Sequence, residues 1–121
     1  MNRWALLEHK VYLDNSVDIH YDFLIEDKID CLTWKFSEIP SLEKNSVQVT
    51  KQPNHRLVWL CRLEHELSGN RGLVRRIDHG KYINVSLKLD INKLKLILDG
   101  HLLNGSFEVS GNIFRLTKKN K

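Results

Sequence analysis

Apolar and polar residues alternate along most of this chain, and this period of two constrains the fold more than any other feature of the sequence. The clearest case is the segment 18–26, whose alternate apolar positions are Ile19, Tyr21, Phe23 and Ile25. Side chains at positions i and i+2 of a β-strand project to the same side. The other face of this strand therefore presents His20 and Asp22 as neighbours.

The same alternation predicts strands along the whole chain. We expect them at residues 4–7, 18–26, 29–36, 47–49, 55–63, 83–89, 94–98, 107–109 and 113–116. Turn-forming residues predict breaks at 14–16, 53–54, 68–72, 79–80, 99–100 and 104–105, and a loop at 37–45. The segment 55–63 is apolar on both sides, which predicts a central strand.

A small chain with this many strands buries its sheet edges best by closing. We therefore predict an all-β fold, a small closed β-barrel of about eight strands with long loops and little helix. A length of 121 residues with 41% hydrophobic content suits one domain, placed at residues 1–117. The basic segment 118–121 is expected to be a disordered tail.

Charge, cysteine content and the lack of long apolar runs indicate which partners and which cellular compartment to expect. Lys and Arg number 19 against 15 for Asp and Glu, a net charge of +4 that permits phosphate-bearing partners. Cys31 and Cys61 lie in apolar contexts and are expected to be buried free thiols. Because no signal peptide and no apolar run of about 20 residues is found, we expect a soluble, cytoplasmic protein without membrane contact. We also expect a monomer.

His20 and Asp22 supply two of the ligands that manganese, iron or zinc accepts. A third ligand must come from elsewhere in the fold. His9 and His55, each at the end of an expected strand, are the best candidates for the remaining roles. The other three histidines, His65, His79 and His101, are expected to be solvated.

Four arginines form a second group that could bind phosphate through bidentate contacts. They are Arg56, Arg71, Arg75 and Arg76.

Two other classes of protein stay open on the sequence patterns. The His-x-Asp spacing also fits a non-haem iron oxygenase that uses 2-oxoglutarate, with His101 and Arg115 completing the site, and the strand pattern also fits a barrel that binds an apolar ligand.

An ordered set of motifs spans nearly the whole chain. It comprises Glu8-His9, His20-Tyr21-Asp22-Phe23, Leu32-Thr33-Trp34, Pro40-Ser41-Leu42, Val47-Gln48-Val49, His55, Ser68-Gly69-Asn70-Arg71-Gly72-Leu73-Val74, Asp78-His79-Gly80-Lys81-Tyr82, Leu98-Asp99-Gly100 and Leu103-Asn104-Gly105. In this order the motifs resemble the 3'-phosphoesterase domain of bacterial DNA ligase D, and the short stand-alone proteins of that family in particular.

The resemblance implies a manganese-dependent hydrolase on a small β-barrel, active in repair of DNA ends. Enzymes of this family remove a 3' ribonucleoside and then the remaining 3'-phosphate from a primer strand. The family's metal ligands correspond to His9, His20 and Asp22, and its phosphate-contacting histidine corresponds to His55. The implied partners are DNA or RNA/DNA 3' ends, with a separate ligase or polymerase acting afterwards.

One departure from the family pattern defines the main alternative. The family places an arginine two residues after the aspartate, where this chain has Leu24. That arginine binds phosphate in the family, so Arg56, Arg71, Arg75 or Arg76 would have to replace it. The alternative is therefore a barrel that binds nucleic-acid ends with little or no turnover.

Overall fold

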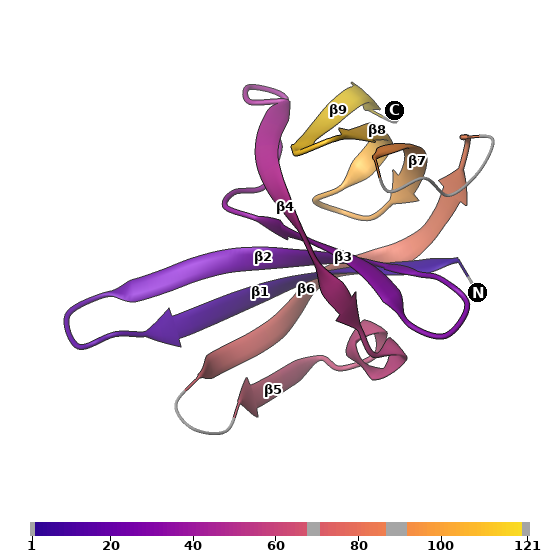
Figure 1. Ribbon diagram of the computed structural model, residues 1–121. Helices are drawn as coiled ribbons and strands as arrows, with labels where there is room; N and C mark the ends of the chain where they lie inside the picture. The colour runs from indigo at the N-terminus through magenta and orange to yellow at the C-terminus, as the bar shows by residue number, and fades with distance from the viewer. Residues whose placement is uncertain (1, 68–70, 87–91, 120–121) are drawn as a thin grey trace.

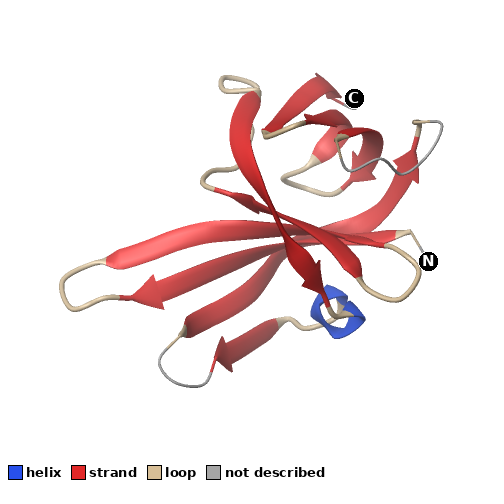
Figure 2. Ribbon diagram, in the orientation of Figure 1, coloured by secondary structure: helices blue, strands red, loops and turns tan. Residues whose placement is uncertain are grey.

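The structure is a computed structural model that describes residues 2–67, 71–86 and 92–119. Nine strands and one short 3-10 helix make up the described chain (Figures 1 and 2). The elements are β1 (Arg3–Tyr12), β2 (Val17–Glu26), β3 (Cys31–Phe36), β4 (Ser46–His55), η1 (Leu57–Leu60), β5 (Glu64–Leu67), β6 (Gly72–Asn84), β7 (Lys93–Asp99), β8 (Asn104–Ser110) and β9 (Ile113–Lys119).

Eight of these strands form a closed ring of antiparallel pairs. Neighbours follow the order β1-β2-β3-β4-β9-β8-β7-β6, and β6 pairs back onto β1. The remaining strand, β5, pairs with the outer part of β6. The all-β fold and the closed, barrel-like sheet of about eight strands are thus confirmed, and closure leaves few sheet edges open.

Aromatic rings fill the interior of the ring of strands. Phe23 lies at the centre of this core, with ring centroids 5.3–6.2 Å from those of Trp4, Trp34, Phe36 and Phe114. All five side chains are buried. The interior that the structure describes is a packed core, whereas a barrel that binds an apolar ligand would need a leucine-lined cavity there.

A second, smaller core lies on the outer face of β1, β2 and β6. Its buried members are Ala5, Leu7, Leu24, Cys31, Leu60 and Val74. Helix η1 covers this face and contributes Leu60, which is 3% exposed. The prediction of a central strand at 55–63 is therefore wrong. Residues 57–60 are apolar because they pack on the outer face of the sheet as the 3-10 turn η1, and the sequence pattern alone does not distinguish this from a central strand.

Among the described residues no helix has the length and apolarity to span a membrane.

Several predicted turns lie inside strands. Pro53 and Asn54 belong to β4, where two residues face one residue of β3; this bulge accommodates the proline, which cannot donate a ladder hydrogen bond. His79 and Gly80 belong to the 13-residue β6. A side chain at Gly80 would collide with the Asp99 carboxylate 1.9 Å away, so glycine is required there for close approach rather than for a turn.

Two further expectations need revision. Lys118 and Lys119 belong to β9 and are not part of a disordered tail, while residues 120–121 lie outside the described residues. Cys31 is buried as predicted, but Cys61 is exposed because it follows η1 on the outer side. The glycine-bracketed segment 68–70 and the end of the strand expected at 83–89 also lie outside the described residues.

The β1–β2 hairpin projects beyond the barrel as a long arm, and β6 pairs with its β1 strand as far as Lys10 (Figure 1). Both strands have ten residues, and only residues 13–16 connect them, closed by the hydrogen bond from Leu13 N–H to Ser16 O (2.8 Å). The predicted strand at 4–7 is too short, because residues 8–12 continue it in the arm. This extension decides the position of His9.

Candidate metal centre

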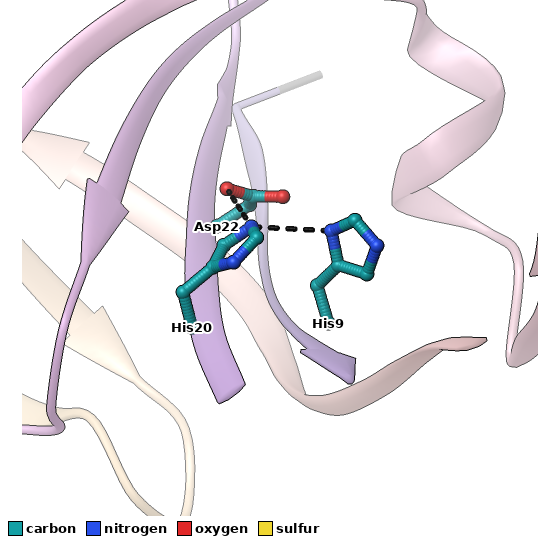
Figure 3. A group of neighbouring side chains, drawn as sticks. All are labelled: His9, His20 and Asp22. Carbon is teal, nitrogen blue, oxygen red and sulfur yellow. Dashed lines mark hydrogen bonds and ion pairs between the residues drawn. The ribbon is translucent and has the colours of Figure 1, made fainter. Parts of the chain in front are cut away.

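Strand pairing places His9 directly beside the His20–Asp22 pair. His9 of β1 is opposite His20 of β2 in the antiparallel register, and Asp22 lies two residues farther along β2 on the same face. One potential ligand atom from each of the three residues lies within 4.8 Å of the others. Figure 3 shows both imidazole rings and the carboxylate turned toward one point.

The individual distances define how the three groups meet. His9 Nδ1 is 3.1 Å from His20 Nε2, and His20 Nε2 is 3.7 Å from Asp22 Oδ1. These atoms form a set of two imidazoles and one carboxylate, which divalent transition metals accept. The donor set therefore fits a divalent cation, which would be held by His9, His20 and Asp22.

A backbone carbonyl fixes the orientation of the His9 ring. His9 Nε2 lies 2.9 Å from the carbonyl oxygen of Arg71, so Nε2 carries the proton and donates it, and Nδ1 keeps its lone pair. Such outer hydrogen bonds commonly set the tautomer of a metal-binding histidine. His9 would consequently coordinate through Nδ1, the atom that already faces His20.

Burial keeps the His20 imidazole neutral. Loss of solvent lowers the pKa of His20 below its usual 6.5, the positive charge of Lys35 lowers it further, and the carboxylates of Asp22 and Asp18 oppose the shift. Its Nδ1 atom is buried without a hydrogen-bond partner. A neutral imidazole is the form that binds metal ions, so this environment suits a ligand.

His55 shares a cavity with the cluster. His9, Asp22 and His55 line one cavity of about 120 Å³ whose remaining walls are Leu7, Trp59, Leu67 and Val74. His55 Nδ1 donates to the carbonyl oxygen of Pro53 at 3.1 Å, which leaves Nε2 as the atom able to exchange a proton with a bound group. Sequence-predicted residues from β1, β2 and β4 thus surround one small space.

The four arginines do not form one rim. Arg75 pairs with Glu8 at 3.3 Å, and because Glu8 precedes His9 in β1 this contact lies on the opposite face of the sheet. Arg76 donates to Leu60 O at 2.7 Å and so anchors the end of η1. Arg56 is exposed at the start of η1, and Arg71 meets the cluster through its backbone carbonyl.

Leu24 belongs to the second core rather than to the cavity wall. Its side chain is fully buried, with Ala5, Leu7 and Val74 in the same cluster. The position held by arginine in the resembled family is therefore closed over by apolar packing here. Any phosphate contact from this site must come from other residues.

The remaining histidines lie outside the cluster. His101 is exposed in the connection between β7 and β8, where its backbone N–H donates to Asp78, and Arg115 pairs with Glu108 at 3.5 Å. The oxygenase arrangement built on His101 and Arg115 is thus not assembled among the described residues. His79 is exposed, and His65 contacts Arg62 and Trp59.

Two neighbours of the cluster are absent from the sequence-based set of candidates. The Arg71 carbonyl is one, and backbone groups leave no signal in a sequence. Lys35, opposite Asp22 in the β2–β3 pairing, is the other. Pairing the expected strands 18–26 and 29–36 as a hairpin would have placed Lys35 opposite Asp22 and so identified it as a neighbour of the cluster.

Comparison with protein-family models and with curated proteins finds no match to this chain.

Proposed function

We propose that this protein is a divalent-metal-dependent phosphoesterase that trims 3' ends of nucleic acid, with manganese as the expected ion. One observation carries the proposal: His9 and Asp22, two of the three clustered potential ligands, line the same small cavity as a separate histidine, His55. A metal site with an additional acid–base group is the arrangement that hydrolysis of a phosphoester needs. The net charge of +4 and the resemblance to the phosphoesterase domain of DNA ligase D favour a nucleic-acid substrate.

Each group has a defined task in this proposal. When bound, a divalent cation offsets the negative charge that develops on the phosphate oxygens during displacement. His9, held by the Arg71 carbonyl, and His20, held neutral by burial, orient the ligand set. As water attacks phosphorus and the P–O bond to the leaving group breaks, His55 in its protonated form would donate the Nε2 proton to the leaving oxygen or stabilise charge on the phosphate.

The test uses a labelled primer–template whose primer ends in a single ribonucleotide. With manganese, the wild-type protein should first yield a primer with a 3'-phosphate and then one with a 3'-hydroxyl. His20→Ala should abolish both steps, whereas His101→Ala, which removes an exposed histidine away from the cluster, should leave them unchanged. Cleavage by His20→Ala at the wild-type rate would overturn the proposal, as would a wild-type protein without activity.

The burial of Leu24 favours one second candidate. Because the family's phosphate-binding arginine is replaced by a fully buried leucine, the chain could bind nucleic-acid ends without turning them over. Such a protein would bind DNA in a salt-sensitive manner with little dependence on metal. The same primer assay separates the two, because a protein that only binds the 3' end would form neither product.

A further inference from the structure

A polar groove adjoins the candidate metal centre on its other side. Its volume is about 390 Å³, and His20 belongs to its lining. The remaining lining comes from β2, β3, β4, the residue after β3 and the β8–β9 turn. His20 thus connects the groove to the smaller cavity that His9, Asp22 and His55 line.

Strand register explains why the groove is polar. Lys35 of β3 pairs with Asp22 of β2 on one side and with Thr50 of β4 on the other. Lys35 and Thr50 therefore share the outer face with the metal cluster. Gln48 and Gln52 lie two residues before and after Thr50 on that face. The inner face of the same strands supplies the main core, whereas Lys35, Gln48 and Thr50 are exposed on the outer face.

The two spaces differ in size and chemistry. The small cavity has about 120 Å³ and walls that are mostly apolar, below the roughly 300–1,000 Å³ of ordinary ligand pockets. The groove falls within that range and offers amide, hydroxyl and ammonium donors. A terminal phosphate group fits the first kind of space, and a nucleotide unit fits the second.

We propose that this groove binds the sugar–phosphate backbone of the strand that carries the scissile 3' end, with Lys35, Gln48 and Thr50 as the main contacts. The proposal rests on the proposed phosphoesterase function and adds the path of its substrate. Apart from His20, the described lining has no aromatic ring, and aromatic rings are the usual platforms for stacked bases. Recognition in the groove is therefore independent of base sequence.

One acidic residue gives the proposal a two-sided test. Asp18 lies in the groove two residues before His20 and is exposed. Its carboxylate repels phosphate, while Lys35 attracts it. Removing one charge should weaken binding, and removing the other should strengthen it. A structural role of either side chain would not produce opposite signs.

The experiment measures fluorescence anisotropy of a short 5'-fluorescein-labelled single-stranded DNA without added metal, over a range of salt concentrations. Lys35→Ala should weaken binding about fivefold, which corresponds to a surface charge contact, and should reduce the salt slope by about 1. Asp18→Asn should tighten binding. Lys28→Ala and Asp14→Asn remove exposed charges in the turns at the ends of β2, and both should bind as the wild type does. Runs of thymidine and of adenosine should bind alike.

The proposal is overturned if Lys35→Ala and Asp18→Asn both bind as the wild type does, or if the wild type does not bind the strand. All four side chains are exposed, and thermal denaturation confirms that each variant is folded. Cleavage of the primer–template is scored separately. Cleavage that the groove variants leave unchanged, in rate and in KM, refutes the groove alone. Groove-dependent binding without cleavage by the wild type refutes the phosphoesterase function alone.

Discussion

Asp78 should contribute more to stability than any exposed acidic residue, because its buried carboxylate accepts four backbone hydrogen bonds. Oδ1 accepts from His79 N–H (3.0 Å) and His101 N–H (2.9 Å). Oδ2 accepts from Leu102 and Leu103 N–H, both at 2.8 Å. The side chain is 5% exposed and holds the β7–β8 connection against β6.

The magnitude follows from these contacts. A hydrogen bond to a charged group contributes about 1.5–3 kcal/mol, but three of the four donors belong to exposed residues and can turn to water. Leu103 is fully buried and its N–H cannot. We expect Asp78→Ala to lower the free energy of unfolding by about 3–5 kcal/mol. The melting temperature should then fall by roughly 10–20 °C.

Urea denaturation followed by tryptophan fluorescence measures this loss, with Asp14→Ala as the control for an exposed aspartate. Asp78→Asn should also be destabilising, because its amide nitrogen would face two backbone donors. A loss below about 1 kcal/mol for Asp78→Ala, or a loss equal to that of the control, would refute the reasoning.

Three other predictions concern single groups. Hydrogen bonds from Arg3 lower the pKa of Glu26 from 4.5 to about 2, so this pair stabilises the fold above pH 4.5 and the contribution disappears as the pH falls toward 2. Unfolding free energies of wild type and Glu26→Gln should differ by about 1–2 kcal/mol at pH 6 and converge near pH 2; a constant difference would contradict this. His55→Ala should leave manganese affinity within about twofold and reduce primer cleavage about 10²–10⁴-fold, as titration calorimetry and single-turnover rates would show; equal losses in both would make His55 a ligand. Burial raises the pKa of Cys31 to about 12, so a thiol reagent at pH 8 should modify exposed Cys61 alone in the folded protein, and mass spectrometry that finds Cys31 modified first would contradict it.

The alternation of apolar residues predicted the barrel because each barrel strand has one face in the core. Phe23 and Ile25 of β2 and Leu94, Leu96 and Leu98 of β7 are all fully buried. The pattern failed where a segment is apolar for another reason. Residues 57–60 pack on the outer face as η1, and period two cannot distinguish that from a central strand.

Residues 8–12 show the opposite failure, because they form a strand that the alternation of apolar residues did not predict. They continue β1 into the projecting arm, where Tyr12 is 59% exposed and little burial imposes a pattern. The sequence therefore placed His9 at a strand end, although it lies within β1 opposite His20. Pairing of His20 with Asp22 followed from strand geometry alone, because residues two apart in a strand share a face.

Polar residues that serve the fold were the hardest to recognise. Asp78 and Tyr82 stood out in the sequence as parts of one motif, yet Asp78 anchors a turn and Tyr82 donates its hydroxyl hydrogen to Glu26 O at 2.6 Å. Their partners are backbone atoms distant in the chain. Only the register of the closed sheet brings such groups together.

The central claim is that His9, His20 and Asp22 bind one divalent ion, and paramagnetic broadening of histidine NMR signals tests it most directly. Manganese added below one equivalent should broaden the ring signals of His9 and His20 first, while those of exposed His79 and His101 stay sharp. Asp22→Asn should weaken this selective broadening at least tenfold. Equal broadening of all the histidine signals, or selective broadening that persists unchanged in Asp22→Asn, would contradict the account.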